Sequence, residues 1–196
     1  MDKYEFNIKV EQIKKMVSRG DYETAMKIAD TIDWHRVRNA SLLSMIAEIY
    51  EKNKEYQEAK DILLLAFERA PIGKRLLYKL TDLALKEGNI AEAEAYYREF
   101  CDLAQDDSRQ YLLRYLILKA KKAPLDQLIR ALETYTAVEV DEKWLYELAE
   151  LYHKGGMGDQ CVRTCDKIML LFGLGKYVEK AMDLKLEYEP LNKYQM

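Results

Sequence analysis

Apolar residues recur every three to four positions along the chain, in blocks separated by short polar turns. The clearest example runs from Ala40 to Pro71, where two such blocks flank a polar turn at Lys54 and Glu55. At helical spacing the first block forms a stripe of Leu43, Ile46, Ala47 and Tyr50, and the second a facing stripe of Ala59, Leu63 and Ala66. The pattern predicts an antiparallel pair of helices. Because one such pair leaves apolar surface exposed, we expect neighbouring pairs of the same kind.

The same pattern returns along the chain. The residue that follows each turn is Tyr22, Tyr56, Ile90, Leu125 and, more weakly, Gly158, at intervals of 34, 34, 35 and 33 residues. Three positions later stands the residue expected at the crossing of the two helices, namely Ala25, Ala59, Ala93, Leu128 and Cys161. A regular period of helix pairs indicates a stacked repeat protein with one continuous core.

These residues resemble the tetratricopeptide repeat (TPR), whose unit of 34 residues carries W-x2-L-G-x2-Y, then A-x3-F, then P. The second repeat matches with Leu43, Ile46, Ala47, Tyr50, Ala59, Leu63 and Pro71. The fifth matches with Leu145, Leu148, Ala149, Tyr152, Cys161 and Cys165, and has Trp144 one residue early. The third repeat is a fair match, and the first and fourth match mainly in their second helices. The resemblance covers roughly nine-tenths of the chain.

The resemblance implies an all-α fold, a right-handed α-solenoid of about five TPR-like helix hairpins with a C-terminal capping helix. We expect one repeat domain over residues 1–190, with repeats near 3–33, 34–71, 72–105, 108–139 and 141–172. A solitary amphipathic helix at 176–188 would cover the open end of the core. Residues 191–196 would then form a short, polar and mobile tail.

Charge and composition exclude several classes of partner. The chain has 31 Lys and Arg against 34 Asp and Glu, a net charge of -3, whereas a general nucleic-acid binder needs a basic stripe. No apolar run approaches the roughly 20 residues of a membrane span, and the start lacks a signal-peptide pattern. The 3 cysteines form no disulfide framework, which favours a reducing compartment. We expect a cytoplasmic protein without nucleic-acid or membrane partners.

Motifs for catalysis or cofactor binding are absent from the sequence. It has no Gly-rich phosphate loop after a strand, no G-x-S-x-G, no H-E-x-x-H and only 2 histidines. The best metal candidate is Cys161 and Cys165 with His153, but both cysteines occupy core positions of the repeat, where free Cys behaves as a small apolar residue. The glycines of 155–158 are better explained as a turn than as an anion-binding loop. We predict no enzyme, no cofactor and no metal site.

The segment from Asp33 to Arg38 has two interpretations. It clusters Arg36 and Arg38 beside Trp34, and such a basic patch could bind an acidic partner or a phosphate. Alternatively, Asp33 caps a helix start, Trp34 is buried at the joint between repeats, and the arginines are solvated. The pattern favours the second interpretation, because Trp is usually buried in part and exposed arginines are common.

A groove for a partner follows from the resemblance. In this family the first helices line the concave surface, so residues one position off the core stripe would face it. These are Ser44, Glu48, Arg75, Tyr78, Asp82, Gln110, Leu113, Ile117, Lys143, Tyr146 and Glu150. Acidic residues stand where the family's two-carboxylate clamp has Asn and basic residues, so that clamp is not expected. The alternative is that these residues form only a solvated surface.

We therefore predict a protein-interaction scaffold that binds a peptide or helix of a partner protein in this groove. Two alternatives remain open at this stage. One is a peptide-sensing regulatory domain of a larger protein. The other is a self-associating module that forms a homodimer through an exposed terminal helix.

Overall fold

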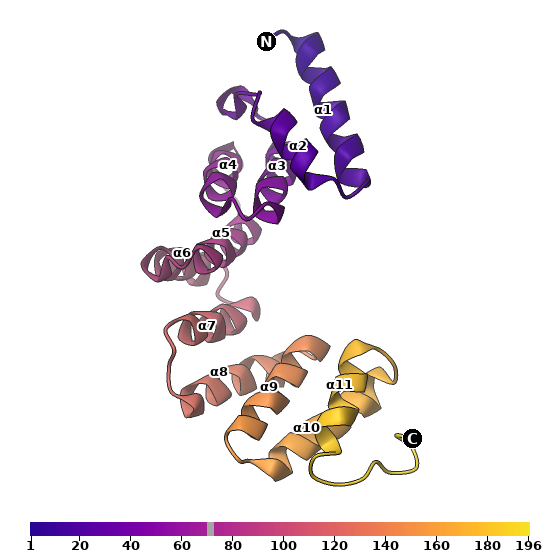
Figure 1. Ribbon diagram of the computed structural model, residues 1–196. Helices are drawn as coiled ribbons and strands as arrows, with labels where there is room; N and C mark the ends of the chain where they lie inside the picture. Colours follow the sequence, from indigo (N-terminus) through magenta and orange to yellow (C-terminus); the bar gives the residue numbers. More distant parts are fainter. Residues whose placement is uncertain (70–72) are drawn as a thin grey trace. The chain divides into compact units, whose positions relative to one another are not determined.

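The computed structural model describes residues 1–69 and 73–196, and it has no strand within these residues. Pro71, which the repeat pattern places at the end of the second hairpin, lies outside them. The elements, drawn in Figure 1, are α1 (Lys3–Ser18), α2 (Tyr22–Ala29), the 3-10 helix η1 (Trp34–Arg36), α3 (Ala40–Lys52), α4 (Tyr56–Arg69), α5 (Lys74–Glu87), α6 (Ile90–Leu103), α7 (Arg109–Ala120), α8 (Leu125–Val138), α9 (Glu142–Lys154), α10 (Gly158–Phe172) and α11 (Lys176–Lys185).

Short polar side chains and glycines set the helix ends. The carboxylates of Asp21 and Asp141 accept the backbone N–H groups of Thr24 and Lys143 at the starts of α2 and α9. At the end of α5, Gly88 adopts a left-handed conformation with φ 87°. α11 ends at Lys185 and is shorter than the predicted helix 176–188, and α2 ends at Ala29, where the chain turns into η1.

The contacts between residues divide the chain into two compact units, residues 1–105 with α1 to α6 and residues 106–196 with α7 to α11. We call them the N-terminal unit and the C-terminal unit and describe each by itself. The boundary falls between the third and the fourth predicted repeats, where the sequence pattern had suggested one uninterrupted domain.

In the N-terminal unit the helices cross at alanines. Ala25, Ala59 and Ala93 are fully buried, as the period predicts. Small side chains at a crossing let two helix backbones approach closely, so that the larger residues beside them can interdigitate. Those larger residues include Ile13, Leu43 and Leu80, each with no exposed surface. The helix pairs α1–α2, α3–α4 and α5–α6 pack as hairpins, and α2 and α4 also contact the next hairpin through α3 and α5.

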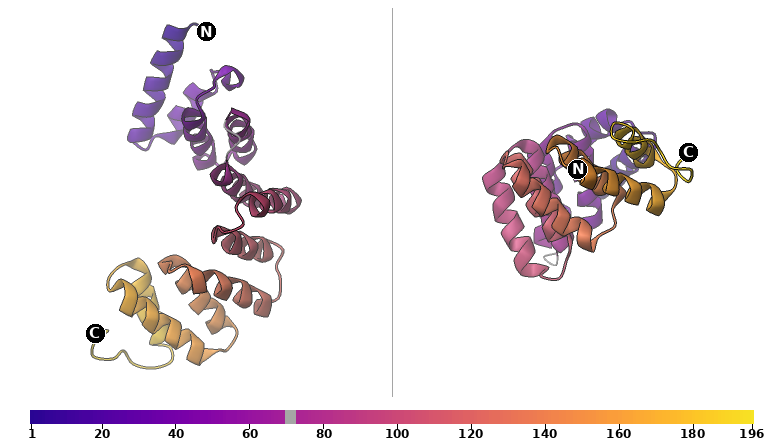
Figure 2. Two further views of the ribbon diagram at one scale, coloured as in Figure 1. Left: turned by 180° about the vertical axis from the view of Figure 1, so that it is seen from behind. Right: turned by 90° about the horizontal axis from the view of Figure 1, so that it is seen from below.

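The C-terminal unit has its own core. Cys161 and Cys165 of α10 are fully buried in it, beside Leu132 of α8. On α8 the predicted crossing residue Leu128 is only partly buried, and Ile129 is buried instead. α10 packs against both α9 and α11 (Figure 2), and α11 covers it with Val178, Ala181 and Leu184. α11 therefore occupies the position expected of a capping helix.

The last residues make contacts that the sequence did not predict. Leu191 packs against the core of the C-terminal unit. The side-chain amide of Gln195 donates to Asp166 over 2.6 Å, and its oxygen accepts from the buried ammonium of Lys185 over 2.8 Å. These contacts hold residues 191–195 against α10 and α11, where a mobile tail had been expected.

Partly buried hydrogen bonds connect successive repeats at equivalent positions. The Tyr50 hydroxyl on α3 donates to Asp30 at the end of α2 over 2.6 Å, and the Tyr152 hydroxyl on α9 donates to Glu133 of α8, also over 2.6 Å. Burial and the neighbouring carboxylate raise the pKa of both tyrosines. The tyrosine of the repeat pattern thus joins the first helix of one hairpin to the second helix of the hairpin before it.

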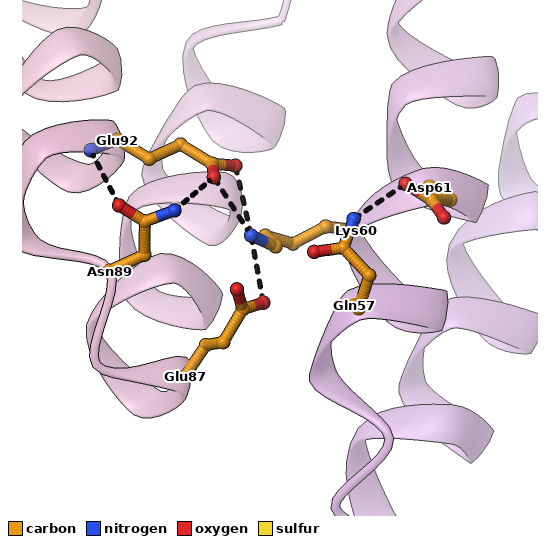
Figure 3. Close-up of polar contacts among 6 residues, drawn as sticks. All are labelled: Gln57, Lys60, Asp61, Glu87, Asn89 and Glu92. Atoms are coloured by element: carbon orange, nitrogen blue, oxygen red, sulfur yellow. Dashed lines mark hydrogen bonds and ion pairs between the residues drawn. The ribbon is translucent and has the colours of Figure 1, made fainter.

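A buried lysine connects α4 to the turn between α5 and α6 (Figure 3). The Lys60 ammonium lies 2.8 Å from Glu87 and 3.0 Å from both carboxylate oxygens of Glu92, and the side chain has no exposed surface. Asn89 donates to the same Glu92 carboxylate over 2.8 Å. Burial alone would lower the pKa of Lys60, but the hydrogen bonds to Glu87 and Glu92 outweigh it and raise the pKa. The lysine is therefore charged at neutral pH.

Replacement of this lysine tests its contribution. Lys60→Met keeps the apolar stem but leaves two partly buried carboxylates without their cation, so we expect the free energy of unfolding to fall by about 2 kcal/mol. The loss should be constant from neutral pH up to the ordinary lysine pKa of 10.5 and shrink only above it, because a raised pKa stabilises the fold until the ammonium deprotonates. Urea denaturation at several pH values measures this. Lys27→Met on the exposed face of α2 is the control, and an equal loss there would contradict the expectation.

Candidate functional site

A groove of about 1030 Å³ lies in the N-terminal unit between α1, η1 with the segment after it, and the start of α3. Its volume is at the upper end of the range typical of ligand-binding clefts. From Lys3 to Lys14, α1 forms one wall along about three helical turns, or about 16 Å. The apolar lining is formed by Phe6, Val10, Ile32, Val37, Leu42 and Met45. We call these six residues the floor of the groove.

The buried Trp34 holds the wall opposite α1. Its side chain is 4% exposed, and its indole N–H donates to the backbone carbonyl of Ala29 over 3.0 Å. The ring of Phe6 on α1 meets it edge-on, with 6.2 Å between centroids. Asp33 accepts the backbone N–H of His35 and caps η1. Two predictions for this segment, a helix cap at Asp33 and the burial of Trp34, are therefore confirmed. Arg36 and Arg38, however, are exposed and line the groove.

The acidic residues of the groove are already engaged within the chain. Asp2 accepts the backbone N–H of Glu5 over 2.7 Å, and Glu11 lies 3.5 Å from the Lys14 ammonium. Hydrogen bonds from the His35 side chain and backbone lower the pKa of Asp33, so its carboxylate is ionised and directed at its own helix cap.

Three basic residues of the groove differ from these carboxylates. Within residues 1–69 and 73–196, Lys3, Arg36 and Arg38 form no ion pair, although Arg36 adds to the field that lowers the pKa of Asp33. We call these three residues the basic rim. Four basic side chains line the groove, Lys3, Lys14, Arg36 and Arg38, against the three carboxylates of Asp2, Glu11 and Asp33, so its positive charges exceed its negative ones by one.

Some residues predicted to line a groove lie near this one. Glu48 is exposed and Ser44 half-buried on α3, one helical turn from the groove residues Met45 and Ser41. The predicted residues thus lie beside the groove on α3. The sequence analysis assigned no role to Leu42 or Met45, and it favoured solvated side chains for Arg36 and Arg38.

The predicted residues of α5 have other neighbours. Arg75 is exposed, while Tyr78 is half-buried and its ring lies 6.2 Å from that of Phe100. Asp82 lies 3.1 Å from the ammonium of Lys86, which also lies 2.9 Å from Glu51 of α3.

Glu51 is the centre of this ion-pair network. Its carboxylate also lies 2.7 Å from Lys79. Burial raises the pKa of Glu51, but the two lysines lower it by more, so its pKa is lowered overall. The network connects α3 to α5 and occupies Asp82.

Two predicted groove residues of the C-terminal unit are buried. Gln110 is half-buried, but Leu113 is 0% exposed and Ile117 is 6% exposed, so their side chains do not face solvent as predicted. α7 also buries Leu112 and Tyr115 on a different face. A helix that is apolar nearly all round is buried on more than one side, and on such a helix a position beside the core stripe is not a surface position.

The other predicted residues of this unit lie on an aromatic surface. The ammonium of the exposed Lys143 stands 4.7 Å from the centroid of the Trp144 ring. The rings of Tyr146 on α9 and Tyr177 on α11 are 6.1 Å apart, and the Lys180 ammonium lies over both. Burial, and then the charge of the half-buried Glu150, raises the pKa of Tyr146. We call Tyr146, Tyr177 and Lys180 the aromatic face; Trp144, two residues from Tyr146 on α9, packs against Tyr115 of α7 instead.

The sequence analysis identified only the α9 part of this face. Tyr177 and Lys180 were missed because the helix 176–188 was considered only as a cap. Their spacing of three residues on an amphipathic helix was the available signal.

The cysteines and histidine considered as a metal site are placed differently. Burial raises the pKa of Cys161, and it raises that of Cys165 to about 12, so both are neutral thiols at neutral pH. His153 pairs with Tyr188 and lies 3.4 Å from Glu187. Among the described residues, no three His, Cys, Asp or Glu side chains are grouped to bind a metal ion. Gly155 to Gly158 lie at the turn from α9 to α10, as predicted.

The helix order and packing define an α-solenoid built of helix hairpins. Comparison with solved structures shows that its fold is that of TPR proteins. A TPR protein of Parabacteroides merdae is 15% identical with a TM-score of 0.73, over 95% of this chain and 73% of that one. A thermophilic TPR protein of Thermus thermophilus is 16% identical with a TM-score of 0.62, over 93% of this chain and 96% of that one. YrrB, described as a TPR protein with an unusual peptide-binding site, is 17% identical with a TM-score of 0.55, over 89% and 90%.

Comparison of the sequence alone adds nothing to this result, because no protein-family model and no curated protein matches the chain. Among the described residues, no helix combines the length and the apolar character needed to cross a bilayer.

The support of the groove wall by Trp34 can be tested. Trp34→Leu removes the bond to Ala29 and part of the contact with Phe6, so we expect the free energy of unfolding to fall by about 2 to 3 kcal/mol. Amide hydrogen exchange of residues 33–39 should become faster than that of α4. Trp144→Leu at the half-buried tryptophan of α9 is the control and should cost less. Unchanged exchange in residues 33–39 would show that Trp34 does not hold this segment.

Proposed function

We propose that the chain is a non-enzymatic protein-interaction scaffold, and that the groove of the N-terminal unit binds a polypeptide segment of a partner protein. The observation that carries the proposal is the groove itself, where an apolar floor lies between two helices and beside exposed charged side chains. Peptide-binding clefts combine these two features, because apolar anchors supply affinity and polar groups at the edge fix orientation.

The construction of the groove supports this proposal. Its walls belong to helices α1 and α3, and the segment between η1 and α3 is tied to the core by Trp34. A binding surface that is already formed in the free protein loses little conformational entropy on association, which favours affinity. The TPR fold adds support by analogy only, since it serves many unrelated partners.

Other predicted groove residues are proposed as additional contacts. Glu48 lies on α3 near the groove and is accessible for a longer ligand. Tyr146, with the rest of the aromatic face, is a separate candidate surface of the C-terminal unit, because partly exposed aromatic side chains often dominate binding energy. Leu113 and Ile117 are not part of the proposal because they are buried.

Selection from a random peptide library displayed on phage tests the groove. Peptides of about 12 residues, long enough to follow α1, are selected on the wild type and then measured one by one. We expect Met45→Glu, which places a charge on the floor, to weaken most selected peptides at least about tenfold, a loss of about 1.4 kcal/mol. Leu170→Glu, on an exposed leucine of α10, is the matched control.

The library also separates the two surfaces. Peptides that are weakened by Tyr146→Ala but not by Met45→Glu would place the binding site on the aromatic face and contradict the proposal for the groove. Circular dichroism of each variant verifies that the helices are intact, so a loss of binding is not a loss of fold.

Self-association is a second candidate, favoured by the outer face of α1. Tyr4 is 76% exposed and Ile8 is 42% exposed on this helix, and they lie one turn apart. A second copy of the chain could cover them in a symmetric contact. If so, sedimentation equilibrium should show a dimer for the wild type and a monomer for the Tyr4→Glu, Ile8→Glu variant. A monomeric wild type at the highest concentration tested would end this candidate.

A further inference from the structure

The charges around the N-terminal groove are unbalanced in a way that selects a type of ligand. Every carboxylate that lines it serves a helix cap or an ion pair inside the chain. The basic rim of Lys3, Arg36 and Arg38 has no ion-pair partner in the described part of the chain. A ligand in the groove therefore meets three cations without an ion-pair partner in the described part of the chain, in a lining whose four basic side chains outnumber its three carboxylates.

The basic rim lies directly beside apolar surface. Arg36 and Arg38 flank Val37 in the chain, and Lys3 stands one turn before Phe6 on α1. A small anion would satisfy the cations but leave the floor in contact with water. A purely apolar ligand would cover the floor but leave the cations partly desolvated and unpaired, which costs free energy. A ligand with both apolar groups and carboxylates on neighbouring faces matches both features.

The dimensions of the groove indicate the size of that ligand. The wall of α1 extends for about 16 Å, which corresponds to about 11 residues of a helix or about 5 of an extended strand. The groove runs between helices, and an amphipathic helix places apolar side chains on one face along such a length.

We propose that the groove binds an acidic amphipathic segment of a partner protein, with its apolar face on the floor and its carboxylates paired with Arg36, Arg38 and Lys3. This inference rests on the proposed function and names the chemistry of the partner. Carboxylate–guanidinium pairs at the edge of a groove are exposed, so they add orientation and rate of association more than affinity.

The peptides selected from the displayed library test the inference. We expect those that lose binding to Met45→Glu to carry a net negative charge, with Asp or Glu beside apolar residues at helical spacing. Their affinity for the Arg36→Glu, Arg38→Glu variant should fall at least about fivefold. It should also decrease as NaCl is raised from about 50 to about 300 mM. The control variant is Arg163→Glu, Lys167→Glu, which makes the same change in net charge on an exposed face of α10.

The outcomes distinguish failure of the proposed peptide site from failure of the proposed acidic ligand. If no selected peptide depends on Met45, the groove is not a peptide site and the proposed function fails together with the inference. If peptides depend on Met45 but are neutral or basic, or bind the charge-reversed variant as well as the wild type, the function stands and the acidic partner is overturned. Equal losses in the control variant would also overturn it, because the effect would then come from net charge. Binding of an oligonucleotide in preference to acidic peptides would indicate a phosphate ligand and contradict the inference.

Discussion

The two helices of a hairpin cover each other's facing apolar side chains, but the apolar side chains on the outer sides of the pair stay exposed unless another element packs on them. This constraint shapes both units. The side left open has to meet the next hairpin, so every crossing must allow close approach. Ala25, Ala59 and Ala93 meet that requirement in the N-terminal unit, and Cys161 meets it in the C-terminal unit. α10 is covered on both sides because α11 follows it as a single helix and packs against it.

Stacked apolar surfaces alone do not fix how one hairpin is placed against the next. Hydrogen bonds and ion pairs of buried and partly buried side chains fix that placement. Apolar contacts are non-directional and allow one hairpin to shift along the next, whereas the hydrogen bonds from Tyr50 to Asp30 and from Tyr152 to Glu133 form in one placement only. The ammonium of Lys60 has the same effect between α4 and the turn at Glu87 and Glu92. A displaced hairpin would break these bonds and leave the fully buried Lys60 side chain without its carboxylates, which costs more than the bonds themselves contribute.

The helix pairs and their period could be predicted from the sequence because both depend on local spacing. A small residue such as Ala59 allows close helix packing, and a glycine such as Gly88 ends a helix, in any hairpin. The site depends on which helix faces meet, and that is not a local property. Leu113 was assigned to a surface by its offset from the core stripe, but α7 is apolar on more than one face, so the offset has no meaning there. The burial of Trp34 was predicted from its type. That Arg36 and Arg38 line a groove could not be predicted, because it depends on the position of α1 opposite them.

The groove exists because one connection departs from the repeat. Within the hairpins of the N-terminal unit the two helices follow at short turns, such as the one through Gly88 between α5 and α6, but between α2 and α3 residues 30–39 form η1 and an extended stretch. This stretch is anchored at two buried residues, Ile32 and Trp34, and the residues after Trp34 remain at the surface. A stretch needed only to join two helices would be expected to place apolar residues inward and mixed charges outward. This one leaves Val37 beside an open groove and surrounds it with arginines that form no ion pair within the described part of the chain. A ligand that covers the valine and pairs with the arginines would remove the valine from water and neutralise the two cations, which is the physical basis of the proposed site.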